Sequence, residues 1–84
     1  MLPMARPSPT HRGIKELTSL GKAIRVLRLK TGLSQEALAN EIGIDRSYMG
    51  GIERGEHNVA LVNLVKIAQA LNITTAELLK KASL

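Results

Sequence analysis

The sequence predicts an all-α fold, a compact bundle of five helices behind a flexible N-terminal tail. From residue 20 almost to the C-terminus, apolar residues recur at intervals of three and four, as along one face of an amphipathic helix. Glycine, asparagine, serine, threonine and aspartate, which end and begin helices, divide this region into short segments. The chain has one Tyr and no Phe or Trp, so we expect an aliphatic core.

We divide the 84 residues into a flexible basic tail, residues 1–18, and one domain, residues 19–84. All three prolines lie in the first ten residues, where apolar periodicity is absent. This composition favours a disordered leader over a basic arm that would reach nucleic acid through Arg6, His11 and Arg12.

The first helix is predicted to begin after a cap at Ser19 and to end at Thr31, before Gly32. Residues 14–17 can add a partial turn ahead of it. Its core-facing stripe comprises Leu20, Ala23, Ile24 and Leu27. Arg28 stands one position past this stripe, so its charged end is expected at the edge of the core.

Two short helices, residues 35–42 and 46–54, are predicted on either side of a tight turn. Gly43 can take a positive φ without a Cβ clash and so ends the first of them, while Ser34 and Asp45 are predicted caps. The second helix would turn outward Arg46, Ser47, Gly50, Gly51 and Arg54. Such a pair is typical of a helix-turn-helix unit, whose second helix enters the major groove of DNA. The alternative is an αα-corner that binds nothing.

Glu53 lies in the last turn of its helix, where a carboxylate meets the negative end of the helix dipole. A cation is therefore expected beside it. Arg28 is the best candidate, with Arg25 and Arg54 as rivals. Because desolvation offsets much of the attraction, such a pair would orient the helices more than it would stabilise them.

The fourth helix is predicted over about residues 60–71, with Asn58 as its cap. Its inner face comprises Leu61, Leu64, Ile67, Ala68 and Leu71. Val62 and Val65 fall on another face, where a monomer would prefer polar groups. Asn72 suits the left-handed residue that ends this helix.

The last helix begins with a T-x-x-E capping box made by Thr74 and Glu77. Leu78 is expected to point into the core. Lys80 and Lys81 suit the negative end of the helix dipole.

Net charge is +5, which suits a polyanionic partner because phosphate contacts supply much of nucleic-acid affinity. The chain has no Cys, no metal-ligand spacing, no phosphate-binding loop and no Ser–His–Asp group. We therefore expect no metal, no cofactor and no enzyme activity. No apolar run reaches the roughly 20 residues of a membrane helix, and the N-terminus lacks a secretory signal. These observations favour a cytoplasmic protein without a membrane partner.

Four segments carry a family resemblance: LGKAIRVLR, GLSQEALANEIGI, IERG and LVKIAQALNITTAELL. In their order they resemble the Cro and lambda-type repressor family of helix-turn-helix domains, also called XRE-type. The resemblance covers residues 20–79. It implies a lambda-repressor-like five-helix domain that regulates transcription and binds a palindromic or pseudopalindromic DNA operator as a homodimer.

The resemblance also implies roles by position. Its base-contacting positions are Arg46, Ser47 and Gly51, and its ion pair is Arg28 with Glu53. Its phosphate-contacting positions are Ser34, Gln35, Arg54, His57 and Asn58. We add Tyr48, whose ring can fill the edge of the core while its hydroxyl reaches a phosphate, although packing alone is as good an interpretation. We expect the dimer contacts at Val62, Val65, Leu79 and Leu84.

Adjacent glycines at Gly50 and Gly51 depart from the family, which has larger side chains in this helix. Each costs the helix about 1 kcal/mol relative to alanine. Either the backbone approaches DNA closely there, or base reading rests on Arg46 and Ser47. An antitoxin or adaptor that uses the same fold to bind a protein, such as a toxin or a polymerase, is the alternative function.

Overall fold

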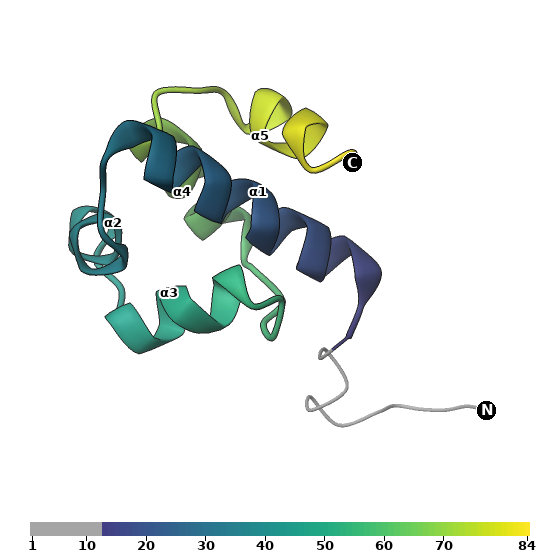
Figure 1. Ribbon diagram of the computed structural model, residues 1–84, viewed down its shortest axis with the longest axis horizontal. Helices are drawn as coiled ribbons and strands as arrows, with labels where there is room; N and C mark the ends of the chain where they lie inside the picture. The colour runs from purple at the N-terminus through teal and green to yellow at the C-terminus, as the bar shows by residue number, and fades with distance from the viewer. Residues whose placement is uncertain (1–12) are drawn as a thin grey trace.

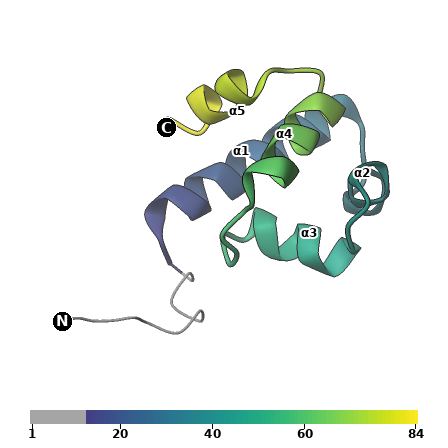
Figure 2. The same cartoon turned by 180° about the vertical axis from the view of Figure 1, so that it is seen from behind.

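Residues 13–84 are described by the structure, a computed structural model. The expectations for the tail at Arg6, His11 and Arg12 lie outside the described residues. Five helices form the described part: α1 (Lys15–Thr31), α2 (Gln35–Ile42), α3 (Arg46–Glu53), α4 (Leu61–Ala70) and α5 (Thr75–Lys81). This architecture confirms the all-α prediction. The long helix α1 crosses the molecule, with α3 on one side of it and α5 on the other (Figures 1 and 2).

Helix α1 begins at Lys15, so the predicted start at Ser19 is wrong. The residue before it, Ile14, has extended backbone and no side-chain cap. No glycine or proline interrupts the sequence between Lys15 and Ser19, and the helix therefore continues through the serine. The Thr18 hydroxyl donates to the Ile14 carbonyl over 3.2 Å, which helps to satisfy the exposed first turn.

Every helix contributes an aliphatic side chain to one core. The largest fully buried side chains are Ile24, Leu38, Met49, Ile52, Ile67 and Leu78. Leu61, however, is 69% exposed, so its predicted place on the inner face of α4 is wrong. It is the first residue of α4, and Val59 packs against the core just before it.

Local signals set most of the helix ends. Ser34 accepts a hydrogen bond from the amide of Ala37, as its capping role predicts. Gly43 ends α2 at φ 77°, and Asn72 takes φ 61° two residues after α4. Two predicted caps are wrong in detail: Asp45 occupies the N-cap of α3 without a side-chain bond, and α4 begins after Ala60 rather than Asn58.

The capping box of α5 is present. The Thr74 amide donates to Glu77 over 2.8 Å, and the Glu77 amide donates to the Thr74 hydroxyl over 3.0 Å. The bond from the Thr74 backbone lowers the pKa of the Glu77 carboxyl from its ordinary value.

None of the helices within residues 13–84 has the length and apolar character needed to cross a bilayer.

Candidate nucleic-acid interface

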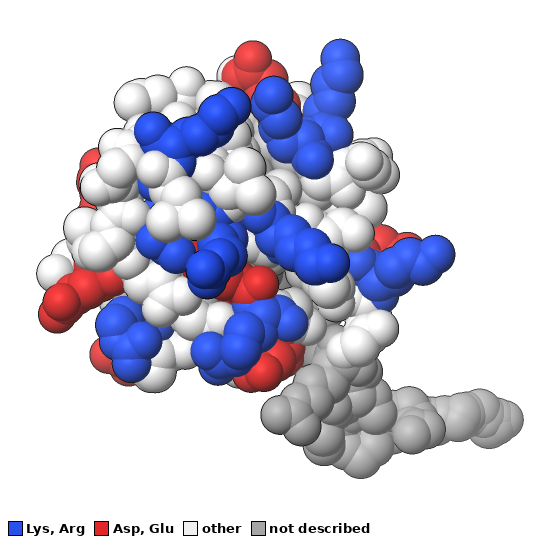
Figure 3. All heavy atoms as spheres, viewed as in Figure 1, with Lys and Arg blue, Asp and Glu red and all other residues white. Residues whose placement is uncertain are grey.

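Helices α2 and α3 pack together and expose the start of α3. Met49 and Ile52 are buried on its inner side, and Arg46 and Ser47 are exposed at its first turn. In Figure 3, Lys and Arg side chains stand over much of the face that α1 and α3 present, interspersed with a few acidic ones. The first turn of α3 is therefore exposed and open to a ligand.

A buried ion pair ties α3 to α1. Arg28 Nε lies 2.6 Å from Glu53 Oε2, and Arg28 Nη2 lies 3.0 Å from Oε1, so the contact is bidentate. The two side chains are only 7% and 2% exposed. Arg28 also donates to the Leu33 carbonyl over 2.9 Å, and the hydrogen bonds to Glu53 raise the pKa of its guanidinium. The partner of Glu53 is thus Arg28 and not Arg25 or Arg54.

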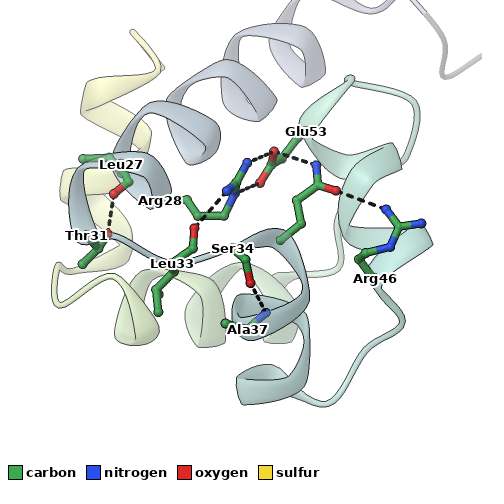
Figure 4. A network of polar contacts seen from close by, with 9 residues as sticks. Leu27, Arg28, Thr31, Leu33, Ser34, Ala37, Arg46 and Glu53 are labelled. Carbon is green, nitrogen blue, oxygen red and sulfur yellow. Dashed lines mark hydrogen bonds and ion pairs between the residues drawn. The ribbon is translucent and has the colours of Figure 1, made fainter.

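The same pair continues outward to the first residue of α3. Gln35 Nε2 donates to Glu53 Oε1 over 3.0 Å, and Gln35 Oε1 accepts a bond of 3.3 Å from Arg46 Nη1. Figure 4 shows the resulting chain of polar contacts from Arg28, inside the molecule, to Arg46 at its surface. The orientation of Arg46 is therefore coupled to the core through one glutamine amide.

Gly50 is buried because the ends of two side chains cover it, so the prediction that it is exposed to a ligand is wrong. A Cβ atom at this position would lie 3.1 Å from Arg54 Nη1 and 3.5 Å from Gln35 Oε1. The ends of these two side chains therefore cover Gly50. Arg54 and Gln35 consequently lie on one face, across α3 from its buried side.

Gly51 is also buried, and its predicted outward orientation is wrong for a similar reason. A Cβ atom there would overlap the imidazole of His57, with Cδ2 only 2.5 Å away. The His57 ring also packs against Tyr48, with ring centroids 4.9 Å apart and planes inclined by 49°. His57 thus takes the space that a side chain at position 51 would fill.

Arg54 has a partner that the sequence did not suggest. Its Nε lies 3.0 Å from Glu56 Oε2, and the hydrogen bond to Glu56 raises the pKa of its guanidinium. The Arg54 side chain is 61% exposed. The one signal in the sequence that could have predicted this contact is the separation of only two residues between the two opposite charges.

The remaining predicted site residues are distributed as follows. Ser34 and Asn58 are exposed near the ends of α2 and α3, and Tyr48 is half-buried against the core. Of the residues expected in a dimer, Val62 and Leu84 are exposed, and Val65 and Leu79 are half-buried. Leu61 is exposed beside Val62, a feature that the sequence interpretation missed.

Comparison with known proteins identifies similar sequences and a similar structure. A family described as "Helix-turn-helix" matches residues 24–78. Control protein C.MunI from a Mycoplasma species is 51% identical over 59 residues, which cover 69% of this chain and 80% of that protein. Control protein C.SmaI from Serratia marcescens is 42% identical over 71 residues, covering 84% and 82%. The crystal structure of the restriction-modification controller protein C.AhdI from Aeromonas hydrophila aligns with a TM-score of 0.75 and 52% identity, over 77% of this chain and 98% of that one.

Proposed function

Because this chain belongs to the helix-turn-helix family, we propose that it is a sequence-specific DNA-binding regulator of transcription. It binds a palindromic or pseudopalindromic operator as a homodimer, with α3 in the major groove. The observation that carries the proposal is the exposure of Arg46 and Ser47 at the start of α3, on the face that Gln35 and Arg54 share. The relatives named as control proteins support a narrower proposal, that this chain controls the genes of a restriction-modification system in the cytoplasm.

Phosphate contacts would set the register of the protein on DNA. Ser34 and Gln35 stand at the N-terminus of α2, whose amides and dipole favour an anion. Asn58 is exposed four residues after Arg54. Arg54 donates Nε and Nη2 to Glu56, so its Nη1 can donate to a phosphate. The Tyr48 hydroxyl is a further hydrogen-bond donor to the phosphate backbone of DNA.

Base reading would rest on Arg46. A guanidinium can donate two bonds to O6 and N7 of guanine. Gln35 already holds one of its nitrogens, so fewer conformations are lost on binding than for a free arginine. Ser47 stands beside it as a small donor and acceptor.

We assign to His57 the contact that the sequence had assigned to Gly51. The glycine has no side chain, and the imidazole lies over it. An imidazole offers a donor and an acceptor to a base or a phosphate. Gly51 would then act by leaving room for His57.

Replacing Arg46 with alanine tests the base-reading role. We expect a loss of about 1–3 kcal/mol that is confined to one base position of each half-site. Arg54→Ala is the matched variant: it should weaken all sequences alike and lower the salt slope of binding by about 1. A selection from randomised DNA, followed by anisotropy titrations at several salt concentrations, measures both. An equal loss of affinity on every sequence for Arg46→Ala would reduce it to a phosphate contact.

Replacing Gly51 with alanine should move His57 without harming the fold. The helix gains up to about 1 kcal/mol in propensity, while the new methyl group displaces the imidazole. We expect Gly51→Ala and His57→Ala to weaken operator binding equally, and the double variant to bind no worse than either. Leu29→Ala on α1 is the control, because Leu29 is 56% exposed and takes no part in the proposed DNA contacts. Additive losses in the double variant would show that the two positions act separately.

Val62→Glu tests the homodimer. Two recognition helices must lie about 34 Å apart to meet successive major grooves, which requires a defined interface. Val62 is 64% exposed, so the substitution should spare the monomer fold and raise the dimer dissociation constant at least about tenfold. Sedimentation at several concentrations measures this, with Leu29→Glu on α1 as the control. A native chain that stays monomeric at high micromolar concentration would remove the dimer from the proposal.

A further inference from the structure

Helices α1 and α5 border a groove of about 350 Å³ that plays no part in the proposed DNA contacts. Its lining is Ser19, Lys22, Ala23, Val26, Leu27, Lys30, Lys81, Ala82 and Ser83. We call it the α1–α5 groove. Figures 1 and 2 show α5 on the opposite side of α1 from α3, so the groove lies away from the recognition helix.

Three lysines and no carboxylate line the α1–α5 groove. Within residues 13–84, Lys22 and Lys30 have no hydrogen bond or ion pair. Glu77, the acidic residue of α5, forms the capping box with Thr74 and also interacts electrostatically with Lys81, so Lys22 and Lys30 are the groove lysines without a counter-charge. A concave surface with such cations on its border is complementary to an acidic partner.

The bottom of the groove is apolar. Ala23, Leu27 and Ala82 line it, and Val26 is 57% exposed on α1. Along α1 the lining extends from residue 19 to residue 30, about 16 Å at 1.5 Å per residue. An elongated occupant with apolar side chains fits these dimensions. A sugar-phosphate backbone would satisfy the lysines but leave the apolar residues without contacts.

We propose that the α1–α5 groove binds an acidic segment of a partner protein. Large apolar side chains of that segment pack on Val26 and Leu27, and its carboxylates pair with Lys22, Lys30 and Lys81. Because α3 lies on the other side of α1, this partner binds while the recognition helix is on DNA. The site is therefore a protein contact of the regulator that is independent of its operator contact.

The test titrates the full 84-residue chain with a synthetic 15-residue helical peptide that has leucines along one face and glutamates beside them. Amide chemical shifts should change along the α1–α5 groove. Lys22→Glu and Val26→Ser should each weaken binding about tenfold, through a reversed charge and a lost apolar contact. Arg25→Glu and Leu29→Ser are matched controls on α1, since both residues are exposed outside the groove and Leu29 is as exposed as Val26. Both controls should bind as the native chain does.

Each of the following outcomes would overturn the proposal. One outcome is that a peptide of scrambled sequence binds as tightly as the designed one. Another is that the designed peptide binds only with a dissociation constant above about 1 mM. A further outcome is that the peptide changes the amide chemical shifts around Arg46 and binds more weakly to Arg46→Ala, which would mean that it occupies the DNA-binding surface. Finally, Lys22→Glu and Val26→Ser alter the monomer–dimer equilibrium in sedimentation, in which case the groove belongs to a second copy of the chain. Retention of peptide binding with operator DNA present is expected, and competition between them would also contradict the proposal.

Discussion

Glu53→Ala is expected to lower the free energy of unfolding by about 3–5 kcal/mol, because it leaves a buried arginine without its counter-charge. Arg28 makes two hydrogen bonds to Glu53 at 2.6 and 3.0 Å, and only its bond to the Leu33 carbonyl would remain. Gln35 would lose its acceptor as well. The free energy of unfolding of a domain of this size is small, so urea denaturation should show a large shift of the midpoint.

Two further variants separate the buried charge from simple loss of a contact. The double variant Arg28→Met with Glu53→Leu removes both charges and fills the space with apolar groups, so its stability should return close to the native value. Glu56→Ala breaks an exposed pair with Arg54 and should cost much less than Glu53→Ala. If Glu53→Ala and Glu56→Ala cost the same, the ion pair with Arg28 contributes no more than a surface contact.

Gly21→Ala is expected to be the second most damaging substitution. A Cβ atom at Gly21 would lie 2.5 Å from the carbonyl oxygens of both Ile52 and Glu53. These are backbone atoms, so α1 and α3 would have to separate. Overpacking of this kind costs about 1–3 kcal/mol or more, which outweighs the helix-propensity gain of about 1 kcal/mol.

Thermal unfolding measures this effect. For a domain of 60–100 residues each kcal/mol lowers Tm by about 4–8 °C, so Gly21→Ala should melt clearly below the native protein. Gly50→Ala in α3 is the control, because its Cβ would meet only the side-chain ends of Arg54 and Gln35 and no backbone atom of α1. Equal melting temperatures for the two variants would show that α1 and α3 can separate at little cost.

The Gly21 contact also couples stability to DNA binding. The chain from Arg28 through Glu53 and Gln35 to Arg46 needs α1, α2 and α3 at fixed separations. A shift of α1 at Gly21 displaces the backbone of Glu53 itself. Loss of packing far from DNA should therefore also reduce base discrimination.

Several features of this fold could be predicted because they depend on neighbouring residues alone. The glycine at position 43 and the asparagine at position 72 adopt positive φ where they follow helices. The capping box of Thr74 and Glu77 closes over three residues. The pairing of Arg28 with Glu53 also had a local signal in the sequence, since a carboxylate in the last turn of a helix is stabilised by a nearby cation.

Other features depended on segments that meet only in the folded chain. Periodicity placed Leu61 inside, but Val59 packs against the core ahead of it and Leu61 is left exposed. Periodicity likewise placed Gly50 and Gly51 outside, but side chains from α2 and from the loop after α3 cover both.

The sequence by itself determined the helix class, most helix ends and the face of α3 that carries Arg46, because each follows from backbone geometry and from apolar spacing within one segment. Only the tertiary structure decided what lies over the two glycines, how Gln35 holds Arg46, and that α1 and α5 leave a basic groove between them. These depend on contacts between one helix and another helix or loop, which are set by packing the whole core and not by a pattern within a single helix.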